Sequence, residues 1–169
     1  MTLSVQTRKA VTASLAAAPG AVLEEIAARH GVSTADVVAC LPAGEALTIS
    51  GSRFEDVMTA IAGWGEVTFL VNTPDVILEA KGTVPQGSMG RGFYNLHGKP
   101  IGGHLKADNC ASIAFVSRKL FSSDTHSVQF YNRDGGCMFK IYLGRGENRE
   151  LIPEQIEHYL ALRARMAAH

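Results

Sequence analysis

A series of short apolar runs, each closed by a turn signal, fills the middle of this chain and most restricts its fold. The runs are rich in β-branched and aromatic residues, which favour strands. Residues 132–136, Asn-Arg-Asp-Gly-Gly, join the last two runs and form the strongest hairpin signal. We therefore expect residues 66–145 to form a mostly antiparallel sheet. The runs cover residues 67–71, 76–80, 93–97, 101–106, 113–118, 127–131 and 138–143.

Helical periodicity dominates the two ends of the chain. Residues 1–65 contain apolar residues at helical spacing, and Pro19-Gly20 divides this portion near its start. Pro153 opens a last helix within residues 146–169. Helices, then strands, then a helix predict an α+β fold. A length of 169 residues fits a single domain, residues 1–169.

The charge balance is neutral over the whole chain but uneven along it. There are 16 basic and 16 acidic side chains. Residues 1–80 hold 4 basic and 9 acidic ones, whereas residues 81–169 hold 12 and 7. A neutral chain is not expected to wrap nucleic acid with its whole surface, but its basic half can receive a small anion.

Cysteine usage and hydropathy indicate a cytoplasmic protein. Cys40, Cys110 and Cys137 are far apart and form no C-x-x-C pair, so we expect free thiols in a reducing compartment. The longest apolar runs are too short to span a bilayer, and no membrane association is predicted.

Residues 21–41 have the texture of a helix-turn-helix pair, with Gly31 in the turn. A recognition helix needs basic or polar side chains that reach base edges. The second helix offers Ser33, Thr34 and Asp36, and no arginine or lysine. We therefore favour a packing role and no nucleic-acid partner, with a helix-turn-helix regulator as the alternative.

A glycine-rich segment between two histidines is the main candidate for ligand binding. His97 and His104 flank residues 98–103, where glycines allow close approach to a flat ligand. Arg91, Lys99 and Lys106 lie nearby in sequence, with the aromatic Phe93 and Tyr94. This set suits a flat acidic macrocycle such as haem, with an imidazole or phenolate on iron and cations on the propionates. For a single histidine, a core or solvated position is the commoner outcome.

Motifs of common enzymes are absent from the sequence. There is no G-x-S-x-G, P-loop, G-x-G-x-x-G or H-E-x-x-H motif. Cys110 lies six residues from His104, but proximity in sequence does not make a catalytic dyad. No catalytic residue is predicted.

Several longer motifs follow one another along nearly the whole chain. They are T-P-D-V-I-L-E (73–79), G-F-Y-N-L-H-G-K (92–99), G-G-H-L-K-A-D-N-C (102–110), F-V-S-R-K-L-F (115–121) and F-K-I-Y-L-G-R (139–145). Together they resemble the HutX/ChuX family of cytosolic haem-utilisation carriers of bacteria. The resemblance implies an α+β fold like half of the larger haem-trafficking proteins, a homodimer, and reversible binding of haem as cargo.

The resemblance also implies particular ligands. His104 matches the histidine that the family uses, and we expect it to bind iron. A second family histidine corresponds to Asn72, whose amide is a poor iron ligand. His97 and Tyr94 are alternatives, but alternation along a strand would put them on opposite faces.

The expected function is that of a cytoplasmic carrier that accepts imported haem and passes it to a haem-degrading enzyme or another acceptor. Arg91 and Lys106 are expected to contact the propionates. The alternatives are an oxygenase-like haem-degrading enzyme, and a structural dimer whose haem binding is incidental.

Overall fold

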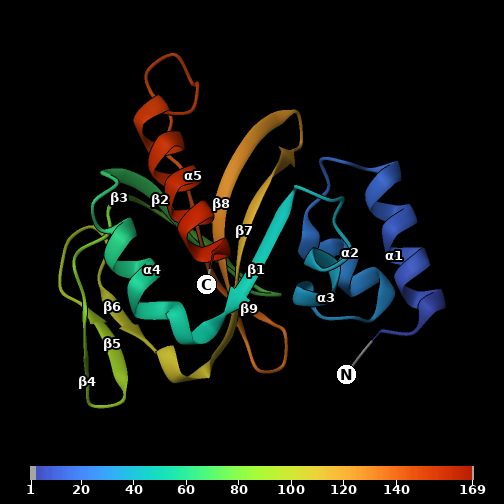
Figure 1. Ribbon diagram of the computed structural model, residues 1–169, viewed down its shortest axis with the longest axis horizontal. Helices are drawn as coiled ribbons and strands as arrows, with labels where there is room; N and C mark the ends of the chain where they lie inside the picture. The colour runs from blue at the N-terminus through green and yellow to red at the C-terminus, as the bar shows by residue number, and fades with distance from the viewer. Residues whose placement is uncertain (1–2, 169) are drawn as a thin grey trace.

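The computed structural model describes residues 3–168 as two antiparallel sheets with five α-helices (Figure 1). The helices are α1 (Val5–Ala17), α2 (Leu23–His30), α3 (Thr34–Val38), α4 (Phe54–Ile61) and α5 (Pro153–Ala167). The strands are β1 (Ala46–Ser50), β2 (Glu66–Asn72), β3 (Ile77–Thr83), β4 (Ser88–Gly90), β5 (Phe93–Leu96), β6 (Gly103–Leu105), β7 (Cys110–Leu120), β8 (Ser123–Asn132) and β9 (Cys137–Tyr142).

The central sheet has the strand order β1-β7-β8-β9-β2-β3, and every neighbouring pair is antiparallel. The predicted hairpin at residues 132–136 joins β8 to β9. There the Asn132 side-chain oxygen accepts hydrogen bonds from the backbone N–H groups of Asp134 and Gly136. Gly135 has a φ of 78°, a conformation that glycine adopts without strain.

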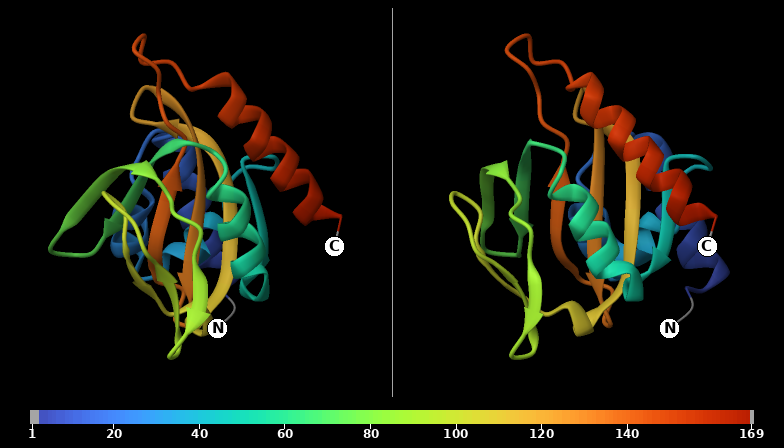
Figure 2. Two further views of the ribbon diagram at one scale, coloured as in Figure 1. Left: turned by 90° about the vertical axis from the view of Figure 1, so that its left-hand side faces the viewer. Right: turned by 60° about the vertical axis from the view of Figure 1, so that its left-hand side comes forward.

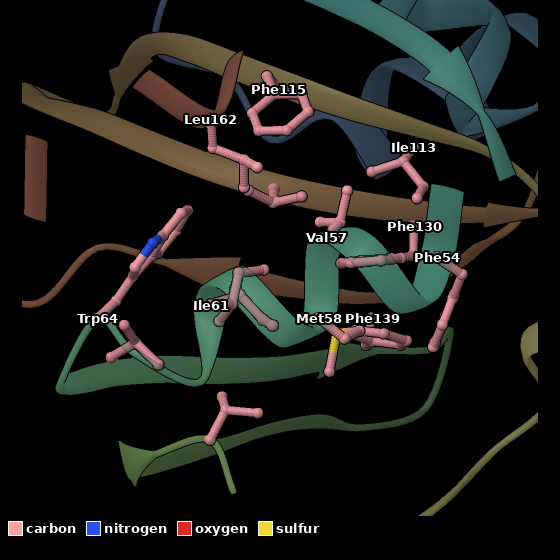
Figure 3. Close-up of a cluster of buried hydrophobic side chains, with 14 of the residues drawn as sticks. Phe54, Val57, Met58, Ile61, Trp64, Ile113, Phe115, Phe130, Phe139 and Leu162 are labelled. Atoms are coloured by element: carbon pink, nitrogen blue, oxygen red, sulfur yellow. The ribbon is translucent and has the colours of Figure 1, made fainter. Parts of the chain in front are cut away.

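One face of the central sheet carries the larger core. Ile113 and Phe115 of β7 and Phe130 of β8 point toward α4 and α5, as Figure 3 shows. Helix α4 is amphipathic and buries four side chains against this face, namely Phe54, Val57, Met58 and Ile61. Phe130 and Phe139 stack with their centroids 4.3 Å apart. Burial of aromatic and aliphatic surface therefore fixes α4 and α5 on this side of the sheet.

The opposite face of the central sheet, here called the outer face, receives α1, α2 and α3. Ala114 and Val116 alternate with the core residues of β7 and pack in a second cluster with these helices. Ser33 forms a capping box with Asp36 at the start of α3. Helix α3 has only five residues, and it buries Val37 and Val38 in this cluster. The helix pair therefore performs the packing role that its sequence indicates.

The small sheet, β4-β5-β6, stands apart from the central sheet (Figure 2). Its inner side carries Tyr94 and Leu96, which are buried in the larger core. The β4–β5 connection is the two-residue turn Arg91-Gly92, with φ values of 53° and 81°. Positive φ at both positions is typical of the type I′ turn of a tight hairpin.

The predicted α+β class is confirmed, with one difference in the first portion. Residues 1–65 are not only helical, because Ala46–Ser50 forms the edge strand β1. This five-residue run lies between two helices, and its pairing with β7 is a long-range contact that periodicity does not report. Within residues 3–168, no helix is long and apolar enough to cross a membrane.

Candidate functional site

His104 lies on the exposed side of the small sheet. Asn95 of β5 pairs with His104 of β6 across the ladder. The Phe93 ring stands edge-on to the His104 ring, with their centroids 5.8 Å apart, and Lys106 Nζ lies 5.8 Å from the Phe93 centroid. We call Phe93, Asn95, His104 and Lys106 the His104 face. It presents an imidazole, an aromatic surface and a cation together.

Arg91 and His97 lie at the two ends of β5. Arg91 is exposed at the tip of the β4–β5 hairpin, two residues before Phe93. His97 is exposed just after β5. Within the part of the chain that the structure describes, no hydrogen bond joins His97 to His104. The structure therefore places Arg91 in the β4–β5 turn and His97 just beyond the other end of β5.

Tyr94 points away from the His104 face. Its side chain is 1% exposed, and its ring packs edge-on against Phe54 with the centroids 5.5 Å apart. Its hydroxyl oxygen accepts a hydrogen bond from the Gly87 N–H at 3.2 Å. Tyr94 therefore lies on the buried side of β5, and its phenol packs in the core in this conformation.

Asn72 lies at the end of β2, in the other sheet. It lines cavities of about 150 and 810 Å³ that include no residue of the His104 face. Within one subunit, the structure therefore brings His104, Phe93 and Lys106 together but does not add Asn72 to them.

A cleft on the outer face, lined by polar and apolar side chains, was not expected from the sequence. Two cavities of about 370 and 150 Å³ adjoin there, between β2, β3, β7, β8 and β9 and the start of α2. One signal was present, since Lys140 is a charged residue within the otherwise apolar run of β9. The residues that line both cavities are Leu70, Glu79, Leu120, Phe121, Thr125 and Tyr142.

Buried charges join the cleft to the helical portion. Lys140 Nζ lies 2.5 Å from Glu24 Oε1 of α2. Burial acts to lower the pKa of Lys140, but its ionisable neighbours Tyr142, Glu24 and Cys137 outweigh burial and raise that pKa. Arg118 donates to the backbone oxygens of Pro19 and Ala21 at 2.6 and 2.8 Å, and burial lowers its pKa. These contacts give the cleft a structural role in holding the helices on the sheet.

Histidine, cysteine and carboxylate side chains of residues 3–168 form no group of three that could hold a bare metal ion. A ligand that brings its own metal needs only one or two protein donors, as haem does. The single imidazole of the His104 face is compatible with such a ligand.

Comparison with known proteins identifies the family. The profile described as "Haem utilisation ChuX/HutX" matches residues 47–162. The chain belongs to the ChuX/HutX family. The resemblance carried by the motifs is thereby confirmed.

Several known proteins are similar to this chain over most of their length. The intracellular heme transport protein HutX of Vibrio cholerae is 36% identical over 85% of this chain and 74% of its own. A protein of Erwinia carotovora has a crystal structure with 39% identity and a TM-score of 0.89, over 98% of this chain and 99% of its own. The heme binding protein ChuX is 37% identical with a TM-score of 0.85, over 93% and 99%.

The expected relation to larger proteins is also confirmed. Apo-PhuS, a heme-binding protein of Pseudomonas aeruginosa, has a TM-score of 0.75 with 14% identity. The match covers 95% of this chain and 48% of PhuS. The ChuX/HutX fold seen here therefore corresponds to half of the larger protein.

Proposed function

We propose that this protein binds haem and carries it in the cytoplasm to a haem-degrading enzyme or another acceptor. The observation that supports this function is the His104 face, where an imidazole, an aromatic ring and a cation share one exposed surface. Haem offers iron to the imidazole, an apolar ring to Phe93 and carboxylates to the cation. The names of the relatives HutX and ChuX support haem as the cargo.

His104 is the proposed iron ligand. Lys106 and Arg91 are the proposed partners of the propionates, because both are exposed at the same end of the small sheet. His97, exposed after β5, is the proposed alternative ligand. An exposed site with few ligands suits a carrier, since the cargo must leave as well as bind.

We also propose a homodimer. Haem has two faces, and the His104 face of one subunit can cover only one of them. β3 is an edge strand of the central sheet, and apolar side chains are exposed just before it and at its start: Val76 is 54%, Ile77 65% and Leu78 63% exposed. Such an edge is suited to pairing with another chain. Asn72, which lies beside this edge, would contact the same haem only if the haem lay between two subunits.

A haemin titration of the protein tests the proposal. We expect a saturable shift of the Soret band for the wild type and its loss in His104→Ala. The matched control is His158→Ala, which removes an exposed imidazole on α5. Absence of a saturable shift in the wild type would overturn the proposal that the protein binds haem. An unchanged shift in His104→Ala would overturn the proposal that His104 is the iron ligand.

Two further measurements distinguish a carrier from an enzyme. When the haem-loaded protein is mixed with apomyoglobin, the apomyoglobin should take up haem faster than it does from free, aggregated haem. Under a reductant and oxygen, the Soret band of the loaded protein should persist. Its decay with release of iron would instead show a haem-degrading enzyme.

A further inference from the structure

We infer that Asn95 is a positioning residue, which holds the His104 imidazole with its proton on Nδ1 and its lone pair on Nε2. This inference rests on the proposed function, because it describes how His104 is prepared to bind iron. The contact that carries it is the hydrogen bond between Asn95 Oδ1 and His104 Nδ1, at 2.6 Å.

The orientation of the Asn95 amide is fixed by its own surroundings. Its Nδ2 atom lies 3.3 Å from the backbone oxygen of Ser88, 3.0 Å from that of Gly90 and 3.0 Å from that of Phe93. Carbonyl oxygens only accept hydrogen bonds, so the side of the amide that faces them must be the NH₂ group. A reversed amide would set its oxygen against three others. The amide oxygen therefore faces His104.

The tautomer of His104 follows from this orientation. An amide oxygen can only accept, so the ring nitrogen 2.6 Å away must carry a hydrogen. In a neutral imidazole the other nitrogen, Nε2, then keeps the lone pair. Histidines that bind metals commonly donate their second ring N–H to such an oxygen, which fixes the ring and the tautomer.

The β4–β5 hairpin supplies backbone oxygens that hold the Asn95 amide in place. Its two-residue turn, Arg91-Gly92, brings the backbone oxygens of β4 within reach of the amide. At Gly90, a Cβ would lie 3.3 Å from Asn95 Nδ2, tighter than ordinary contact, so a side chain there would press on the amide. The conformation of the hairpin is thus coupled to the orientation of the ligand.

Asn95 is a neutral acceptor, so it orients the His104 ring without adding a charge to the site.

The tautomer can be tested in the haem-free protein. Long-range ¹H–¹⁵N correlation spectra of the imidazoles distinguish a protonated from an unprotonated ring nitrogen. We expect His104 of the wild type to be protonated at Nδ1, and Asn95→Ala to shift it toward the Nε2–H form. A wild-type His104 protonated at Nε2 would overturn the inference, whatever haem does.

Haem binding gives a second, separate readout. We expect Asn95→Ala to weaken haemin binding about 10- to 100-fold. The iron–imidazole stretching band of its ferrous complex should move to lower frequency, which general loosening of the hairpin would not cause. Asn148→Ala, at an exposed asparagine in the loop before α5, is the control and should change neither value.

The outcomes separate this inference from the proposed function. If the wild type binds haem through His104 but Asn95→Ala has the same affinity and the same stretching band, Asn95 has no positioning role while the carrier function stands. If the wild type binds no haem, the proposed function fails, while the tautomer of His104 still reports on Asn95. Asn95→Ser, judged by circular dichroism to be folded, replaces Asn95→Ala if the alanine variant does not fold.

Discussion

Glu24 of α2 and Lys140 of β9 form an ion pair that joins the helical portion to the centre of the sheet. Their charged atoms lie 2.5 Å apart, and the two side chains are 20% and 5% exposed. Lys140 lies opposite Gln129 of β8 on the outer face of the sheet. The pair therefore fixes where α2 lies on the sheet, next to the cleft of the outer face.

Removing one partner of this pair should be costly. In Lys140→Ala the Glu24 carboxylate stays in a poorly solvated place without its counter-charge, and we expect a loss of about 3–5 kcal/mol of unfolding free energy. Urea denaturation measures this loss. The double variant Glu24→Leu/Lys140→Met should recover most of it, because no unpaired charge remains.

The matched control is the exposed pair of Lys119 and Asp124, whose charged atoms lie 2.9 Å apart. Their side chains are 55% and 78% exposed, so Lys119→Ala should cost less than about 1 kcal/mol. Equal losses at Lys119 and Lys140 would contradict the role given to the buried pair.

Arg91 and Lys106 should contribute through the propionates of haem. Both cations are exposed, so each change to alanine should weaken haemin binding only about two- to fivefold. A haem whose propionates are esterified should bind the wild type and both variants equally. Lys9→Ala, at an exposed lysine of α1, is the control. If a variant weakens binding of the esterified haem as much as binding of haemin, the cation that it lacks does not act through the propionates.

Much of the fold could be predicted because its signals are local. The turn at residues 132–136 and the capping box at Ser33 depend on neighbouring residues alone. β1 was missed because its pairing with β7 depends on residues far away in the sequence. The full length of β7 and β8 was underestimated because their far ends, near Lys119 and Asp124, are polar and exposed.

The candidate site was only partly predictable for the same reason. The alternation of side chains along β5 puts Tyr94 on the opposite side from Phe93 and Asn95, but it does not tell which of the two sides faces the core. That choice depends on packing against Phe54. The pairing of Asn95 with His104 depends on the register across residues 97–102, which no local pattern sets. The importance of Asn95 is therefore visible only in three dimensions.

The thiols of Cys110 and Cys137 should make the protein less stable at alkaline pH. Burial raises the pKa of Cys110 to about 11 and that of Cys137 to about 12, against an ordinary value of 9.0. The unfolded chain thus loses these protons at lower pH than the native state does. Their contribution to stability is complete below pH 9.0 and is lost as pH rises to about 12.

Denaturation at a series of pH values measures this loss. In the double variant Cys110→Ala/Cys137→Ala, the unfolding free energy should fall less steeply with pH above 9.0. Alkylation by iodoacetamide, mapped by mass spectrometry, should be slow at both thiols near pH 9 in the native protein and fast in urea. Rapid alkylation of either thiol in the native protein at that pH would contradict the effect of burial.

Substitutions at Tyr94 and His104 distinguish the two side chains as candidates for the iron ligand. Tyr94→Phe keeps the ring against Phe54 but removes the acceptor of the Gly87 N–H, so we expect a loss of about 1 kcal/mol of stability. The phenol is buried on the inner side of β5, so the Soret band of the haem complex should stay that of the wild type. A changed band with an intact fold would show that Tyr94 leaves the core when haem binds. The paired variant His104→Phe should have the opposite profile, with stability nearly retained at an exposed position and the haem spectrum lost.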